Sequence, residues 1–144
     1  MAGTADAPRL CLNMIVRNES AIIERCLGSV APYIDCYVIL DTGSSDDTPT
    51  RIERFFSERN IPGQVHLGEF ENFSTTRNKA LQLAEAADLA FDYILLIDAD
   101  MELQVNDPSW KNRLQAPVYS VRQHNTIAYD NVRLLRRDLG ARYV

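Results

Sequence analysis

Runs of apolar residues along the chain predict buried strands, because a strand covered on both faces does not alternate apolar and polar positions. Between these runs, apolar residues recur every three or four positions, as on the inner face of a helix. The predicted strands span residues 10–16, 36–40, 64–67 and 93–97. Strand and helix patterns alternate up to this point, which predicts a mostly parallel sheet with right-handed crossovers.

Polar residues and prolines mark where the helices should begin and end. Asn18 is placed to cap the first helix, and Pro32 ends it. Thr48 as cap and Pro49 at the first helical position open the second helix. Ser74 is expected to cap a third and longer helix.

The pattern changes after residue 100. Residues 117–123 and 128–136 look extended and are joined by a turn-like stretch at 124–126, with no helix between them. We therefore expect an antiparallel hairpin added to the sheet. Residues 1–9 are expected to form a flexible leader without signal-peptide features, and 10–144 to form one domain.

Composition narrows the function classes. The hydrophobic content of 46% and charged content of 24% are ordinary for a globular domain. A net charge of -5 argues against a nucleic-acid partner, and no apolar stretch is long enough to predict a transmembrane segment. The three cysteines lack C-x-x-C spacing, so we expect buried, reduced thiols and a cytoplasmic location.

Candidate chemistry gathers where predicted strands end. Residues 17–19 follow the first strand, 41–44 follow the second, and Asp98 and Asp100 follow the fourth. Open α/β sheets bind ligands at this edge. In an extended segment, residues two apart point to the same side, so both acids can reach one divalent cation.

A further cluster, Arg77 and Asn78, is predicted in the first turn of the third helix, where free backbone N–H groups and the helix dipole favour an anion. Together these side chains predict a divalent-metal site facing a phosphate-bearing substrate. Each also has a purely structural interpretation: 41–44 as a turn, Asn18 as a helix cap, Arg77 as a solvated residue. The basic residues Arg133, Arg136 and Arg137 are interpreted as a solvated strand end.

Four motifs carry a family resemblance. They are LNMIVRNE at 12–19, LDTGSSD at 40–46, TRNKAL at 76–81 and IDAD at 97–100. In order and spacing they resemble family 2 glycosyltransferases of the GT-A fold, notably bacterial members, some fused to tetratricopeptide repeats. The resemblance implies a Rossmann-like, three-layer α/β domain that binds a nucleoside-diphosphate sugar, a UDP- or GDP-sugar, with Mn²⁺ or Mg²⁺.

The resemblance also assigns roles by position. Asp41 matches the acid that recognises the base, and Glu19 an acid near base or ribose. Asp98 is implied near ribose or metal and Asp100 on the metal, while Arg77 lines the nucleotide and diphosphate region. The residues expected to contact substrate are Asn18, Glu19, Asp41, Gly43, Ser44, Arg77, Asn78 and Asp98, and those expected to hold metal are Asp98 and Asp100.

The resemblance leaves the catalytic base unassigned. Family members commonly invert the anomeric centre and carry the base in an acceptor-binding half downstream, and no such motif follows Asp100 here. We expect the chain to stop before that half, leaving a donor-binding module with an unknown acceptor and an exposed sheet edge open to self-association. Thr42, where many relatives carry another Asp, leaves base recognition to Asp41.

Other functions fit less well. A P-loop nucleotidase or dinucleotide dehydrogenase would need glycine motifs that are absent. A nucleotidyltransferase would need a glycine-rich basic loop after the first strand. A receiver-type signalling module, with Asp41 or Asp98 as phosphoacceptor, and a pure interaction domain stay as alternatives.

Overall fold

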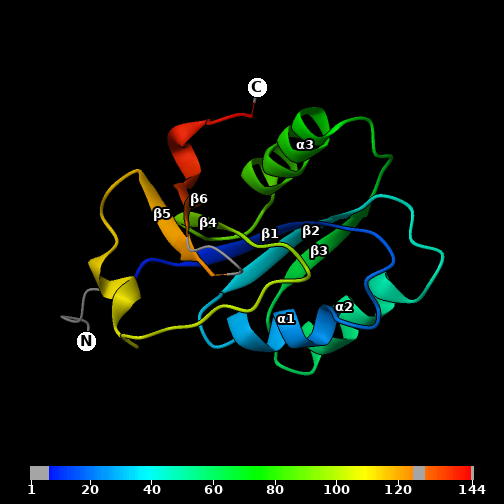
Figure 1. Cartoon of the computed structure of the whole chain (residues 1–144), viewed down its shortest axis with the longest axis horizontal. Coiled ribbons are helices and arrows are strands. Elements are labelled where there is room, and N and C mark those ends of the chain that lie inside the picture. The colour runs from blue at the N-terminus through cyan, green and yellow to red at the C-terminus, as the bar shows by residue number, and fades with distance from the viewer. Residues whose placement is uncertain (1–6, 125–128, 144) are drawn as a thin grey trace.

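A six-stranded sheet of order β3-β2-β1-β4-β6-β5 runs through the protein (Figure 1). The computed structural model describes residues 7–124 and 129–143. The strands are β1 Leu10–Val16, β2 Cys36–Asp41, β3 Gly63–Leu67, β4 Tyr93–Leu96, β5 Val118–Gln123 and β6 Tyr129–Arg136. The first four are parallel, and β6 pairs antiparallel with both β4 and β5. This confirms the predicted mostly parallel sheet with an antiparallel hairpin.

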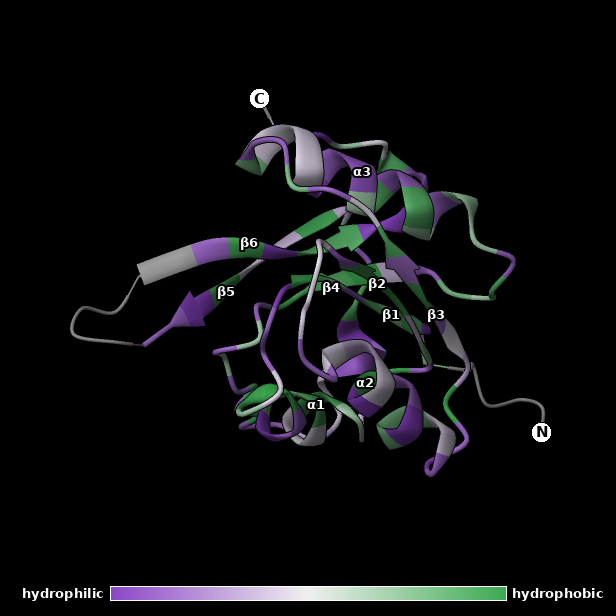
Figure 2. Cartoon of the chain, turned by 90° about the vertical axis from the view of Figure 1, so that its right-hand side faces the viewer, coloured by the Kyte–Doolittle hydropathy of each residue, from purple (hydrophilic) through white to green (hydrophobic). Residues whose placement is uncertain are grey.

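Helices cover both faces of the sheet, giving three layers (Figure 2). The helices α1 Ile23–Val30 and α2 Thr48–Ser57 lie on one face, and α3 Phe73–Ala86 lies on the other. Two short 3₁₀ turns, η1 Trp110–Arg113 and η2 Arg137–Leu139, complete the secondary structure of the described residues. None of the helices in those residues is long and apolar enough to cross a membrane.

The central strand β1 shows why the sequence folds this way. Leu10, Leu12 and Met14 are fully buried in the core shared with α1 and α2, while Cys11 belongs to a second core on the α3 side. Asn13 also faces α3, where its Nδ2 donates to the carbonyls of Val38 and Ala80. Because both faces of β1 are covered, the strand needs no alternation of apolar and polar residues.

The helix starts differ from those predicted. The cap of α3 is Asn72, whose Oδ1 accepts from the backbone N–H of Thr75 at 2.8 Å, so Ser74 lies inside the helix. An asparagine three residues before a free N–H is a strong cap, and it outcompetes the later serine. Arg77 consequently lies in the second turn, beyond the free N–H groups, and the predicted helix-terminus anion site does not include it.

The other two predicted caps are also displaced. Asn18 lies five residues before α1 and caps no helix, and α1 begins without a side-chain cap. Thr48 is the first residue of α2, and its backbone N–H donates to Asp46 Oδ1 at 3.0 Å. The proline in the first turn of α2 is confirmed.

The C-terminal segment returns to α3 and ties it to the sheet. Arg137 donates to the carbonyls of Glu85, Ala87 and Leu89 at the end of α3, and its guanidinium lies 3.9 Å from the centroid of the Phe91 ring. The prediction of a solvated strand end is therefore wrong for Arg137. The proposed leader residues 1–6 and the turn residues 125 and 126 lie outside the described part of the chain.

Candidate functional site

The loops that follow β1 and β2 are joined by hydrogen bonds. Asn18 has a positive φ of 52°, and its backbone N–H donates to Ser44 Oγ at 2.8 Å. Its Oδ1 accepts from the backbone N–H of Ser45 at 2.8 Å. Asparagine tolerates this left-handed conformation better than most residues. The side chain of Asn18 binds the loop after β2 instead of capping α1 as predicted. The first two predicted clusters therefore lie together.

Asp41, at the end of β2, organises the second loop. The residue is 1% exposed. Its Oδ1 accepts from the N–H groups of Gly43 and Ser44, and its Oδ2 accepts from Ser44 Oγ at 2.6 Å. Gly43 has φ +113°, a backbone conformation that residues with a side chain rarely adopt. The carboxylate of Asp41 thus holds a tight turn at the edge of the sheet.

Glu19 links the β1 loop to the acids after β4. Partial burial is the main cause that raises the pKa of Glu19, and the negative charges of Asp100, Asp46 and Asp98 raise it further. Hydrogen bonds from Thr48 are the main cause that lowers the pKa of Asp46 to about 2. The structure therefore brings carboxylates from three loops into one electrostatic neighbourhood.

Asp98 lies between two arginines that are almost fully buried. Its Oδ1 is 3.0 Å from Nη2 of Arg77 on α3, and its Oδ2 is 3.7 Å from Nη1 of Arg133 on β6. The side chain of Asp98 itself is 41% exposed, so a ligand can reach it. Arg77 leaves Nε and Nη1 buried without a hydrogen-bond partner.

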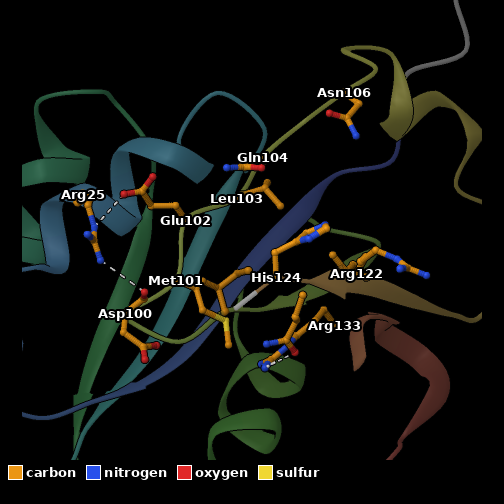
Figure 3. A pocket seen from close by; sticks show the side chains of 13 residues that line it. Arg25, Asp100, Met101, Glu102, Leu103, Gln104, Asn106, Arg122, His124 and Arg133 are labelled. Atoms are coloured by element: carbon orange, nitrogen blue, oxygen red, sulfur yellow. Dashed lines mark hydrogen bonds and ion pairs between the residues drawn. The ribbon is translucent and has the colours of Figure 1, made fainter. Parts of the chain in front are cut away.

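Asp100 borders a cavity of about 720 Å³ between the loop after β4 and the β5–β6 hairpin. Arg25 of α1 holds the loop, with Nε 2.9 Å from Glu102 Oε1 and Nη2 3.5 Å from the carbonyl of Asp100. Figure 3 shows these contacts on one side and Arg133 of the hairpin in the wall of the same cavity. The loop therefore has a fixed course beside the two acids.

Asn78 is directed elsewhere. Its Nδ2 donates to the carbonyl of Tyr143 at 2.8 Å, and its Oδ1 accepts from the Tyr143 N–H at 2.7 Å. Both polar atoms of the side chain thus bind the C-terminal segment. The structure brings Asn18, Gly43 and Ser44 into one loop cluster, as expected, but it gives Asn78 a different partner.

The donor set for a cation is small. Among residues 7–124 and 129–143, no three His, Cys, Asp or Glu side chains are grouped so that they could hold a metal ion. Asp98 and Asp100 offer hard carboxylate oxygens, the ligand type that Mg²⁺ and Mn²⁺ prefer. Mg²⁺ commonly takes one or two carboxylates and completes its shell with water and phosphate oxygens, so this pair fits such an ion bound together with a diphosphate.

Sequence reasoning missed Arg133. The residue was predicted to be solvated, but it is 7% exposed and contacts Asp98. The signal that points to it is the antiparallel pairing of β6 with β4. Leu134 lies opposite Leu95, so Arg133 lies beside the C-terminal end of β4. That register becomes known only once the hairpin is placed in the sheet.

Two curated proteins resemble about two thirds of this chain in sequence. A tetratricopeptide-repeat-containing protein of Synechococcus elongatus is 37% identical over 95 residues, which are 66% of this chain and 21% of that protein. The SPbeta prophage-derived glycosyltransferase SunS of Bacillus subtilis is 33% identical over 96 residues, 67% of this chain and 21% of its own length. The chain thus spans about a fifth of these relatives.

Solved structures show the same fold. The mannosyltransferase PcManGT from Pyrobaculum calidifontis, in complex with GDP-Man and Mn²⁺, superposes with a TM-score of 0.61 at 20% identity, over 81% of this chain and 35% of that one. S. aureus TarS 1-349 in complex with UDP-GlcNAc superposes with a TM-score of 0.50 at 21% identity, over 64% of this chain and 26% of that one. These likenesses confirm the expected GT-A-type fold.

The family assignment rests on the sequence itself. The model of the family "Glycosyl transferase family 2" matches residues 11–118, well over half of the chain. That range contains the β1, β2 and β4 loops described above. The chain belongs to glycosyl transferase family 2.

Proposed function

We propose that this domain binds a nucleoside-diphosphate sugar, a UDP- or GDP-sugar, together with Mn²⁺ or Mg²⁺, as the donor part of an inverting glycosyltransferase. The observation that carries the proposal is the meeting of the β1, β2 and β4 loops at one edge of the sheet. There Glu19 lies within electrostatic reach of Asp46, Asp98 and Asp100. Family membership supports the same function, and PcManGT and TarS, which have this fold, were solved with nucleotide sugars.

Each part of the cluster has a task in this proposal. Asn18, Gly43 and Ser44 shape the pocket edge for base and ribose, with Asp41 as the acid that recognises the base and Glu19 beside it. Asp41 already accepts three hydrogen bonds from its own loop. We therefore propose that the carboxylate of Asp41 and this loop recognise the nucleotide base together. Arg77 supplies positive charge toward the diphosphate. We propose that Asn78 supports this region through its hydrogen bonds to Tyr143.

Asp98 and Asp100 are the proposed metal ligands. Asp98 already faces two arginines, which leaves Asp100 as the carboxylate more open to a cation. When bound, Mn²⁺ or Mg²⁺ would act as a Lewis acid that stabilises the departing nucleoside diphosphate. The chain's own contribution is to orient the two acids and to hold positive charge beside them.

Transfer to an acceptor is a separate proposal, since the chain spans only about a fifth of its curated relatives. We propose that an acceptor binds in or beside the cavity next to Asp100, and that a carboxylate outside residues 7–143 acts as base. The three buried cysteines carry no disulfide, which supports a reducing, cytoplasmic location. The open edges of the sheet support self-association.

Calorimetric titration of the folded chain with UDP and with GDP, each with and without Mn²⁺, tests donor binding. We expect binding of one nucleotide that strengthens with Mn²⁺. If a folded sample binds neither nucleotide at millimolar concentration, the proposed function is wrong.

Two carboxylate-to-amide variants test the metal role. Asp100→Asn should reduce the Mn²⁺-dependent gain in affinity by about tenfold or more, because it removes the more open charged ligand. Asp138→Asn is the matched control: this side chain is 77% exposed and lies near the end of β6 that pairs with the start of β4, away from the loops of the site. Equal Mn²⁺ dependence in both variants would contradict the assignment.

A further inference from the structure

Arg133 lies near the middle of β6 and has an unusual environment for a charged residue. Its side chain is 9% exposed, although the neighbouring residues Asn131 and Val132 are exposed. On one side, its Nε and Nη2 both donate to Gln123 Oε1, at 3.2 and 3.0 Å. On the other side, its Nη1 faces Asp98 Oδ2 at 3.7 Å. The guanidinium therefore bridges β5 and the loop after β4.

A buried guanidinium is costly unless it is paired and hydrogen-bonded. Surface packing alone would not require a cation at this position, since an apolar side chain on β6 would fill the same space. Arg133 instead faces the carboxylate that Arg77 contacts from α3. Each oxygen of Asp98 thus faces its own arginine, Arg77 at hydrogen-bond distance and Arg133 at ion-pair distance.

The same side chain also forms part of the wall of the cavity beside Asp100. Its partner Gln123 lines that cavity as well. The Arg133 guanidinium therefore lies in the cavity wall beside Gln123 (Figure 3). It also faces an acid of the proposed donor site, Asp98.

We propose that Arg133 is a positioning residue of the donor site, which fixes the carboxylate of Asp98 from the hairpin side and so links the β5–β6 hairpin to donor binding. The inference rests on the proposed function, because it assigns Asp98 to the donor. Arg133 acts through Asp98 and through Gln123, and its replacement changes donor affinity by releasing Asp98 from one of its two fixed contacts.

A double-mutant cycle tests this link. The variants are Arg133→Ala, Asp98→Asn and the double variant, and the measured quantity is the Kd for UDP or GDP with Mn²⁺, whichever the wild-type chain binds. We expect Arg133→Ala to weaken binding about tenfold in the wild-type background and to have little further effect in the Asp98→Asn background, since residues in one ion-pair network are not additive. Effects that simply multiply would overturn the proposal.

Two further variants separate positioning from loss of folding. Arg133→Lys keeps the charge but lacks the fork that contacts Gln123 and Asp98 together, so it should recover binding only in part. Arg136→Lys, on the same strand but 44% exposed and paired with Asp138, should bind as the wild type does. If Arg133→Lys and Arg133→Ala keep the wild-type Kd, Arg133 is only structural and the proposal fails.

The outcomes distinguish this inference from the function on which it rests. If the wild-type chain binds neither UDP nor GDP, the proposed function fails first. If it binds and the Arg133 variants, folded by circular dichroism, bind equally well, the donor site stands and the role of Arg133 is refuted.

Discussion

At the scale of single residues, the site depends on backbone conformations as much as on side-chain chemistry. Asn18 and Gly43 both have positive φ, and each lies in a loop that follows a central strand. Hydrogen bonds that Asp41 and Ser44 accept from backbone N–H groups hold these conformations in place. The acids at this edge are therefore positioned by a rigid turn, whose conformational cost is offset by these hydrogen bonds.

Two glycines provide a matched test of that rigidity. Gly43→Ala should destabilise the protein by about 1–3 kcal/mol, because its φ of +113° disfavours a side chain although no atom lies within 4 Å. Gly28→Ala, in an exposed position of α1 with equally open space, should stabilise it by about 0.5–1 kcal/mol. Urea denaturation measures both, and changes of the same sign would contradict the backbone argument.

Acid titration gives a second residue-scale prediction. The lowered pKa of Asp46 means that its carboxylate stabilises the folded state above pH 3.8 and loses this effect as the pH falls towards about 2. Asp46→Asn should therefore lower the urea midpoint at neutral pH, by a difference that narrows as the pH falls below 3.8.

Glu19 should behave in the opposite way. Its pKa is raised from 4.5, so its charged form is disfavoured in the folded protein. Glu19→Gln should raise the urea midpoint at neutral pH, and this gain should disappear as the pH falls through the raised pKa towards 4.5. A loss of stability at neutral pH in Glu19→Gln would contradict the electrostatic assignment.

At the scale of elements, α3 is held at one end by a neighbouring residue and at the other by a residue distant in sequence. Asn72 caps its start, and Arg137 binds three carbonyls at and just beyond its end. The first of these contacts is local, and the second joins residues about fifty positions apart. Because Arg77 lies on α3, the contacts at the two ends of the helix also hold Arg77 in place beside Asp98.

Removing the distant cap should loosen the helix end. Arg137→Ala should destabilise the protein by about 2 kcal/mol, since three partly buried carbonyl groups lose a charged donor. Arg136→Ala, whose side chain is more exposed and pairs only with Asp138, should cost under about 1 kcal/mol. Urea denaturation compares the two, and hydrogen exchange should show the loss of protection at residues 84–89 only in the first variant.

At the scale of the whole molecule, the sequence predicts the sheet better than the site. The bounds of β1 were predicted to the residue, because a run covered on both faces has sharp ends at polar residues. The cap of α3 was misplaced because Asn72 and Ser74 are both good caps, and only the backbone decides between them. Arg133 was missed because its neighbour Asp98 lies in the loop after β4, and the register between β4 and β6 is set by packing.

The buried thiols offer a prediction for the whole molecule. Cys11, Cys26 and Cys36 are all buried, and burial is the main cause that raises the pKa of Cys26 to about 12. With Ellman's reagent, the native protein should show no fast-reacting thiol, and three should react in denaturant. One thiol that reacts at once in the folded protein would contradict this packing.

The sheet order has a consequence for how the protein folds. The neighbouring strands β1 and β4 join residues far apart in the chain. At their start, the backbone N–H of Arg9 donates a hydrogen bond to the carboxylate of Asp92, 83 positions away. Closing so long a loop costs chain entropy before any contact offsets it, which places the protein among the slower-folding topologies. Glu19 follows β1 and Asp98 follows β4, and these two strands pair with each other. Glu19 therefore meets Asp98 and Asp100 only when this long-range pairing is complete, and a chain with β4 undocked lacks the proposed donor site.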